Sequence, residues 1–275
     1  MNDRIPEYAR ILAGSYSPTP RARAVALADS RTGPFGPDGL SDIDLYVYKE
    51  DEIPLPDRER IASENSTKAE MANRFWEEGD EWLARKPAVK VDAMFRDSGT
   101  GTGSARSPTR LHDLLLIQCP NLQVAFRPRR LVGALKARVT QPYPDGLRDA
   151  ILAKNHPVLR NTLSSCFRQI AAAAQRGDYV SLNHRVSALL ASYFDILFAV
   201  NRMAHPGEKR LVRFFQERCP LKPGGFSKEV SSLLEGVSNG GKGVVDRVVV
   251  LLGSLDAWLS GLGLLPAWPT PKGRV

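Results

Sequence analysis

The periodicity of the apolar residues changes near Pro144, and this change divides the chain into two parts. Upstream, short segments show the alternating or continuous apolar pattern of β-strands, with helical patterns between them. Downstream, apolar residues recur at helical spacing between breaks that contain Gly and Pro, which is typical of an antiparallel bundle. We therefore predict an α+β protein, with a mixed sheet flanked by helices over residues 1–140 and a helical bundle over residues 141–275.

The expected elements follow from the same patterns. Strands are predicted over residues 24–28, 42–48 and 89–95. A short helix is predicted over residues 5–12, and two helices over residues 57–86, the second of which carries Trp76 and Trp82. In the bundle, breaks are expected at residues 156–157, 177–178, 205–207, 223–225 and 239–241.

Composition excludes several classes of protein. Of the 275 residues, 43% are hydrophobic and 25% are charged, as in ordinary globular proteins, and no apolar run of about 18 residues could span a membrane. The N-terminal residues lack an apolar signal core, so we expect a cytoplasmic protein without a membrane partner. Three cysteines without CxxC spacing predict buried thiols. The net charge of +8 suits a nucleoside triphosphate or a nucleic acid, and an ordinary basic surface is the alternative.

Asp42 and Asp44 stand two positions apart in a strongly alternating segment. Because strand side chains point alternately to opposite faces, both carboxylates leave one face while Ile43, Leu45 and Val47 enter the core. Paired carboxylates repel one another unless a cation bridges them, and Mg²⁺ prefers such oxygen ligands. The segment therefore predicts a metal site, and a solvated strand face is the alternative interpretation.

Asp92 is the one acid in the predicted strand over residues 89–95. If this strand lies beside the first, Asp92 completes a cluster with Asp42 and Asp44 that could hold two metal ions about 3.5–4 Å apart. In such a pair, one ion activates an acceptor hydroxyl and the other neutralises the triphosphate and the leaving pyrophosphate.

These motifs resemble, in their order and spacing, the DNA polymerase β-like nucleotidyltransferase superfamily. The resemblance rests on the turn at Asp29-Ser30, the strand Ser41-Asp42-Ile43-Asp44 and the later Val91-Asp92. The helical part is similar to a little-characterised bacterial family of this superfamily, which has an N-terminal nucleotidyltransferase domain and a C-terminal helical domain. That similarity lies in the segments at residues 143–144, 181–185, 191–195 and 205–210.

The resemblance implies an enzyme that moves a nucleoside monophosphate, most simply AMP from ATP, to a hydroxyl acceptor. Residues 1–140 would form the catalytic domain, and residues 141–275 would bind nucleotide and substrate. Two Mg²⁺ ions would be held by Asp42, Asp44 and Asp92, and Ser30 would contact the triphosphate. The acceptor could be a small molecule, a protein or RNA.

The turn departs from the family pattern at Asp29, where the superfamily usually has glycine. An acid there places a side chain and a negative charge where the phosphate approaches the backbone. The alternative function is therefore a catalytically weakened protein that retains the fold and binds a nucleotide or RNA.

A predicted helix over residues 178–203 brings several polar side chains to one face. At about 100° per residue, His184, Asp195 and Arg202 fall on a single stripe with small alanines between them. The stripe is either a wall of the acceptor pocket, with Asp195 as a candidate general base, or a hydrogen-bonded network that ties two helices together.

Residues 205–210 break one helix and begin the next, which places Lys209 and Arg210 in a first turn where the dipole disfavours cations. Anion binding would explain them, so we expect Lys209 and Arg210 to contact the nucleotide. A solvated charge pair is the alternative. Glu208 is a second candidate base, by resemblance to antibiotic-modifying relatives, and favourable charge at a helix start is the alternative for it.

Three other features carry weaker expectations. Residues 236–242 match the phosphate-binding pattern G-x-x-x-x-G-K, but Gly243 replaces the usual Ser or Thr, so we expect a helix connection. The four histidines lack metal-ligand spacing and are expected at caps or on the surface. A basic stretch could contact RNA or form a solvated helix face, and it consists of Arg127, Arg129, Arg130, Lys136 and Arg138.

Overall fold

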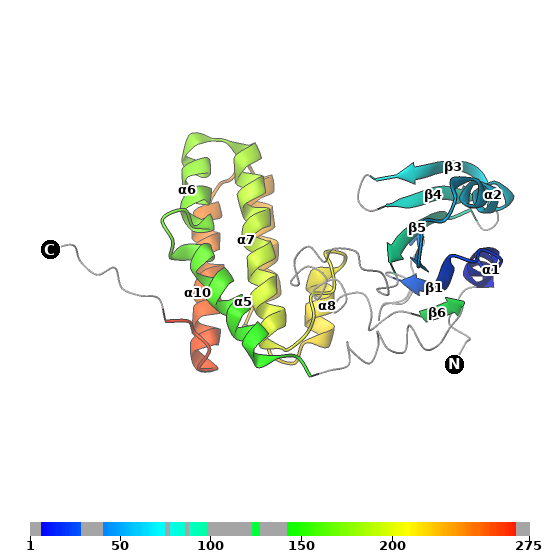
Figure 1. Ribbon diagram of the computed structural model, residues 1–275. Coiled ribbons are helices and arrows are strands. Elements are labelled where there is room, and N and C mark those ends of the chain that lie inside the picture. Colours follow the sequence, from blue (N-terminus) through cyan, green and yellow to red (C-terminus); the bar gives the residue numbers. More distant parts are fainter. Residues whose placement is uncertain are drawn as a thin grey trace. The chain divides into compact units, whose positions relative to one another are not determined.

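The computed structural model describes residues 7–28, 41–74, 78–85, 88–97, 123–126 and 142–267 (Figure 1). The chain divides into two compact units, residues 1–141 and residues 142–275. The first unit contains a six-stranded sheet and the second contains helices, and each has its own cluster of buried apolar side chains. The predicted α+β class is confirmed.

The sheet has the strand order β3-β4-β5-β2-β1-β6, and β2 and β5 are its parallel pair. The other neighbouring strands run antiparallel. The strands are β1 (Ala22–Ala28), β2 (Ile43–Lys49), β3 (Ser66–Asn73), β4 (Gly79–Ala84), β5 (Lys90–Asp97) and β6 (Gln123–Phe126).

One face of the sheet forms the core of the first unit. Ile43, Leu45 and Val47 of β2 enter this core, as the alternation predicts. Side chains of helices α1 (Glu7–Ser15) and α2 (Leu55–Asn65) belong to the same buried cluster. The opposite face of β2 is also buried, so this strand is covered on both sides.

The second helix predicted within residues 57–86 is wrong, because the chain there forms strands β3 and β4. Buried and more exposed positions alternate along β4, with Asp80 and Trp82 buried, which fits a strand and not a helix. Backbone pairing of β4 with β5 outweighs the local preference of the helix-forming residues in this stretch. Trp76 lies outside the described residues.

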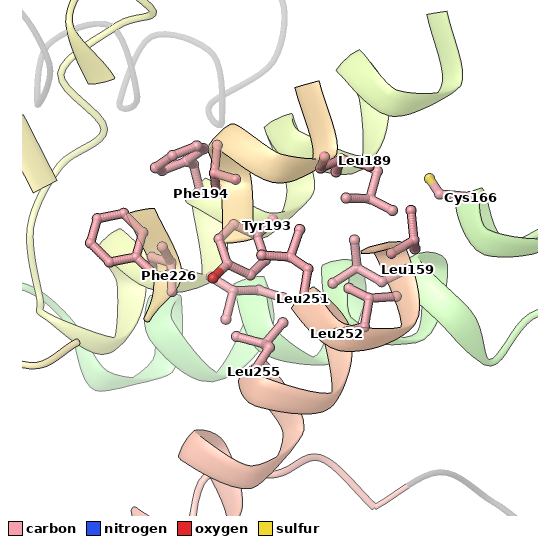
Figure 2. Close-up of a cluster of buried hydrophobic side chains, with 14 of the residues drawn as sticks. Leu159, Cys166, Leu189, Tyr193, Phe194, Phe226, Leu251, Leu252 and Leu255 are labelled. Atoms are coloured by element: carbon pink, nitrogen blue, oxygen red, sulfur yellow. The ribbon is translucent and has the colours of Figure 1, made fainter. Parts of the chain in front are cut away.

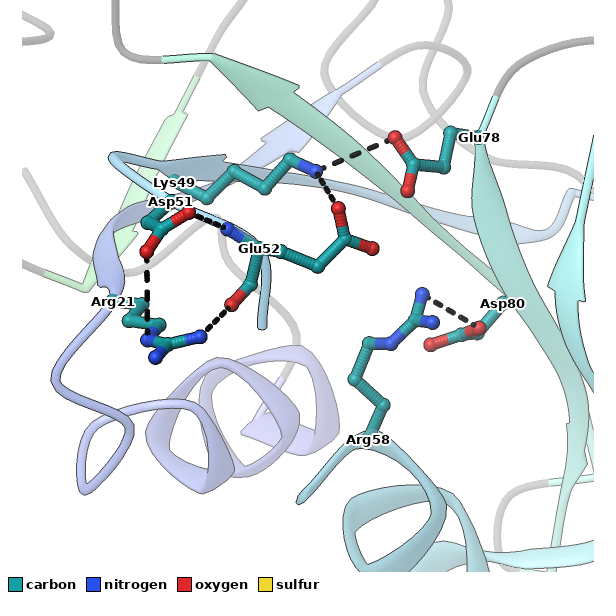
Figure 3. A network of polar contacts seen from close by, with 7 residues as sticks. All are labelled: Arg21, Lys49, Asp51, Glu52, Arg58, Glu78 and Asp80. Atoms are coloured by element: carbon teal, nitrogen blue, oxygen red, sulfur yellow. Dashed lines mark hydrogen bonds and ion pairs between the residues drawn. The ribbon is translucent and has the colours of Figure 1, made fainter. Parts of the chain in front are cut away.

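A buried ion pair ties α2 to the sheet. Arg58 of α2 donates from Nη1 to Asp80 Oδ1 of β4 at 3.3 Å (Figure 3), and the backbone N–H of Ala72 donates to the same oxygen at 2.8 Å. The Arg58 guanidinium also lies over the ring of Phe95, 4.8 Å from its centroid. Burial raises the pKa of Asp80 and outweighs the Ala72 hydrogen bond and the Arg58 charge, which lower it.

The second unit consists of helices packed around one apolar core. In Figure 2, Tyr193, Leu251 and Leu255 lie close together within this core. The helices are α5 (Asp145–Arg160), α6 (Cys166–Arg176), α7 (Tyr179–Val200), α8 (Leu211–Arg218), α9 (Phe226–Ser238) and α10 (Val244–Gly261).

Four of the five predicted breaks fall between helices, but the break at residues 156–157 is wrong. Pro157 lies inside α5, and His156 is buried there instead of capping a helix. Its Nε2 is 2.7 Å from Asp256 Oδ1 of α10, and Arg160 Nη1 donates to Asp256 Oδ2 at 3.3 Å. These contacts hold the helix together around the proline, which lacks a backbone donor.

Other expectations concern single features. Cys166 and Cys219 are buried free thiols, whereas Cys119 lies outside the described residues. Residues 236–242 run from the end of α9 into its link to α10, so the predicted helix connection is confirmed. In the part of the chain that the structure describes, no helix has both the length and the apolar character needed to cross a membrane.

Candidate metal centre and helical pocket

Asp42, Asp44 and Asp92 gather on the face of the sheet opposite the core. Strand β5 lies parallel to β2, with Asp44 directly beside Asp92 in the register. One carboxylate oxygen from each of the three residues lies within 4.8 Å of the others. The juxtaposition therefore arises because β5 pairs with β2, although α2 and the β3–β4 hairpin lie between them in the chain.

The three carboxylates differ in exposure. Asp44, inside β2, is 6% exposed, while Asp42, just before the strand, and Asp92, near the start of β5, are half-buried. The cluster is therefore held by backbone pairing, and Asp42 and Asp92 keep partial access to solvent while Asp44 is buried. Three carboxylate oxygens at this separation form a donor set that fits a hard divalent cation such as Mg²⁺.

Lys90 and Glu81 also belong to this face, and sequence reasoning missed them. The Lys90 ammonium is 2.9 Å from Asp92 Oδ1 and 2.9 Å from Glu81 Oε2. Lys90 shares a face with Asp92 because they are two positions apart in β5, a signal that the sequence contains. Glu81 joins them because β4 pairs it with Asp92, which depends on a strand that the sequence did not predict.

Neighbouring charges and burial shift the pKa values at this face. Burial raises the pKa of the Asp92 carboxyl, and the charges of Glu81 and Asp42 raise it further. The hydrogen bond and charge of Lys90 lower this pKa, but the raising effects are larger. Burial lowers the pKa of Lys90, but its hydrogen bonds to Asp92 and Glu81 outweigh this and raise it. The charges of Glu81 and Asp42 thus disfavour the ionised form of Asp92, which is an electrostatic condition that a bound cation relieves.

Several predicted positions lie outside the described residues. These are Ser30, which was expected to contact the triphosphate, Asp29 beside it, and the basic stretch Arg127, Arg129, Arg130, Lys136 and Arg138.

The polar stripe predicted on residues 178–203 does not form as one helix face. Helix α7 ends at Val200, and Arg202 follows it with a left-handed backbone, φ 51°. The Arg202 guanidinium instead donates to Asp145 Oδ1 of α5, from Nη2 at 2.7 Å and from Nε at 3.0 Å. His184 is exposed, and Asp195 is half-buried, with its Oδ2 at 3.5 Å from Asn155 Nδ2.

The expectation that Lys209 and Arg210 occupy a first helical turn is also wrong. Helix α8 begins at Leu211, and Arg210 is the residue before it, with φ 56°. Gly207, at φ 91°, and Arg210 both adopt left-handed backbone, which keeps the chain out of a helix until Leu211.

Three of the predicted residues meet in one pocket of the helical unit. Asp195, Glu208 and Arg210 line a hollow of about 920 Å³ beside α7, α8 and α9, and His205 lines it too. Lys209 is not among the lining residues of this pocket. The sequence predicts Asp195 and Glu208 as candidate bases and Arg210 as a nucleotide contact, and the structure places all three in the lining of one pocket.

Comparison with known proteins shows likeness in structure and not in sequence. No family model and no curated protein sequence matches the chain. Among solved structures, the chain is similar to a nucleotidyltransferase-like protein from Exiguobacterium sibiricum 255-15, at 14% sequence identity and a TM-score of 0.43. The match covers 94% of this chain and 75% of the other. A likeness this distant does not assign a family, so the function is argued from the site.

Proposed function

We propose that the chain is a metal-dependent nucleotidyltransferase, which moves a nucleoside monophosphate from a nucleoside triphosphate to an acceptor hydroxyl. The observation that carries this proposal is that carboxylate oxygens of Asp42, Asp44 and Asp92 lie within 4.8 Å of one another, with Asp44 and Asp92 side by side on two parallel strands. Paired strands bring three hard oxygen ligands together beside two partly exposed carboxylates, which suits metal-assisted phosphoryl chemistry.

The same three aspartates are the residues that would hold Mg²⁺, and the superfamily pattern suggests two ions. When bound, the metal supplies positive charge that stabilises the charge developing on the phosphoryl and pyrophosphate oxygens. Lys90, between Asp92 and Glu81, positions the Asp92 carboxylate through its ion pairs. ATP is the simplest donor, with AMP as the transferred group.

The remaining roles are proposals that the resemblance motivates. Asp195 and Glu208 are candidate general bases for the acceptor hydroxyl. Both line one pocket, which supports the proposal that they act on the same acceptor. Lys209, Arg210 and Ser30 are proposed to contact the nucleotide phosphates. Residues 1–140 would then carry the catalytic centre, and residues 141–275 would bind substrate.

The test is to incubate the full-length protein with Mg²⁺, each α-labelled nucleoside triphosphate in turn and a cell extract. We expect label to pass to an acceptor with release of pyrophosphate, and we expect chelation of Mg²⁺ to stop the transfer. Asp92→Asn should abolish transfer, whereas Asp97→Asn changes an exposed carboxylate on the same strand and should leave it intact.

Two results would contradict this function. Transfer that persists equally in Asp92→Asn and Asp97→Asn would show that the three-aspartate cluster takes no part. Nucleotide binding with neither label transfer nor pyrophosphate release would instead identify a protein that binds nucleotide without turning it over.

A further inference from the structure

The pocket of the helical unit has the size and lining of a small-molecule site. Its volume of about 920 Å³ lies within the range of about 300–1,000 Å³ that is usual for ligand pockets. Its apolar wall comes from three helices, which contribute Leu190, Phe194, Leu211, Val212, Val230 and Leu234.

This apolar wall is open to a ligand. Leu190, Leu211 and Val212 are half-buried, and Leu234 is 47% exposed, while Phe194 at 3% exposed sits deeper. Apolar surface grouped in a concave site with polar groups beside it is the usual composition of a site for a small organic molecule.

The polar side of the pocket offers both hydrogen-bond acceptors and donors. Asp195 and Glu208 supply carboxylate oxygens, and Arg213 and Gln216 supply hydrogen-bond donors. The backbone N–H of Gly207 donates to His205 Nδ1 at 3.2 Å, which assigns the ring proton of a neutral His205 to Nε2. Burial lowers the pKa of His205 and favours this neutral form, against the charges of Asp195 and Glu208, which raise it.

Arg210 enters this lining through a backbone conformation that residues with side chains rarely adopt. Its φ of 56° lies in the left-handed region, and such positions gather at ligand sites because the surrounding structure must hold them there. Glu208 and Arg210 of this segment both line the pocket.

A second hollow in the same unit shows a contrasting lining. This hollow, of about 300 Å³, is lined by Arg168, Arg176 and Arg185 with Ser and Gln side chains, and its described lining includes no acid. Such a lining suits an anion. The large pocket combines two carboxylates, arginines and an extended apolar wall, which is a poor match for the phosphates of RNA.

We propose that the large pocket binds the acceptor, and that this acceptor is a small organic molecule with an apolar body and hydroxyl or amino groups, not RNA or protein. The proposal rests on the nucleotidyltransferase function proposed above and narrows its acceptor. Carboxylates accept hydrogen bonds from hydroxyl or amino groups, while the apolar wall takes the body of the molecule.

The test is a substitution that fills the pocket with a large side chain in the full-length protein. Ala191 lines the pocket and is exposed, so Ala191→Trp should occlude it without disturbing the core. Ala188→Trp is the matched control, because Ala188 is exposed on the same helix and does not line the pocket. The probe is the fraction of a cell extract below about 1 kDa, a cut-off that retains molecules of drug-like size.

Two measurements are made on each variant. Native mass spectrometry without nucleotide should show an adduct below about 1 kDa on the wild type and on Ala188→Trp, reduced about tenfold or more in Ala191→Trp. With Mg²⁺ and α-labelled ATP, label should appear in the small-molecule fraction, and Ala191→Trp should lower it to the same extent. Asp44→Asn should stop labelling while leaving the adduct in place.

The outcomes separate this proposal from the function on which it rests. Label on RNA or protein, or an adduct and labelling unchanged in Ala191→Trp, would overturn the pocket assignment while nucleotidyl transfer stands. No label on any fraction would overturn the transfer activity itself, and with it the assignment of an acceptor.

Discussion

Acidic side chains on the two faces of the sheet have different neighbours. On the core face, Asp80 of β4 is 1% exposed and is matched with Arg58 and the Ala72 N–H. On the other face, Asp42, Asp44 and Asp92 converge on one another. The register explains the separation, because Asp80 lies beside Ala93 of the core, whereas Glu81 lies beside Asp92.

This contrast separates the acids that stabilise the fold from those that are placed to bind a ligand. A fully enclosed carboxylate requires a partner within the protein, because an unpaired buried charge is costly. Carboxylates that converge on one another oppose folding by mutual repulsion, and a cation from solution can relieve that repulsion. The pairing of Asp80 is therefore structural, and the three-aspartate cluster is the candidate metal centre.

The largest effect expected from this comparison is on activity. Asp44→Asn should lower the rate of label transfer by about 10³-fold, because the loss of a metal ligand removes several kcal/mol of transition-state stabilisation. Its free energy of unfolding should not fall, since the change removes repulsion. Rate assays and urea denaturation on the same preparation would measure both, and a destabilised but active variant would reverse the two assignments.

Removal of the buried Arg58 guanidinium should lower stability and not act at the metal centre. Arg58→Met should lower the free energy of unfolding by about 3 kcal/mol, because Asp80 loses its partner and Phe95 loses the stacked guanidinium. Adding Asp80→Asn in the same background should restore part of that loss, which denaturation of the single and double variants would measure. Stability unchanged in Arg58→Met would show that the pair does not support the fold.

A smaller effect is expected where β4 approaches β5. A Cβ on Gly79 would lie 2.9 Å from the carbonyl oxygen of Ala93, so Gly79→Ala should cost about 2 kcal/mol of stability and disturb the register that sets Glu81 beside Asp92. Gly253→Ala is the control, because Gly253 lies exposed in α10 with open space around its Cα. That change should raise stability slightly through helix propensity. Equal changes in melting temperature in both variants would contradict the close approach of Gly79 to the Ala93 carbonyl oxygen.

The smallest effect expected is a pH dependence from Asp80. Its pKa is raised in the folded state, so between its ordinary value of 3.8 and the folded value the native state binds more protons than the unfolded state. The stability of the wild type relative to Asp80→Asn should therefore fall as pH rises through this window, and then stay constant. Denaturation of both proteins across the acidic range measures this difference, and a relative stability that rises with pH would have the wrong sign.

Much of this architecture is predictable because it depends on local periodicity. Strands β1, β2 and β5 and most helix breaks follow from apolar spacing and Gly or Pro signals. The choice of Asp42, Asp44 and Asp92 needs the two-residue period of strands, the assumption that β2 and β5 are neighbours, and the resemblance to the nucleotidyltransferase superfamily.

The features that were missed depend on contacts between distant parts of the chain. Strand β4 contains helix-forming residues, and pairing with β5 decides its conformation. Pro157 stays within α5 because His156 and Arg160 reach Asp256, about a hundred residues away. The left-handed backbone of Arg210 could not be predicted from the sequence, because arginine does not favour that conformation.

Binding of Mn²⁺ to the full-length protein tests directly whether the three aspartates form a metal centre. Binding is measured by the loss of the EPR signal of free Mn²⁺. The wild type and Asp80→Asn should bind Mn²⁺ alike, whereas Asp44→Asn and Asp92→Asn should each bind it about a hundredfold more weakly. Equal binding by all four proteins would show that the three aspartates do not form a metal centre, and the proposed activity would lose its basis.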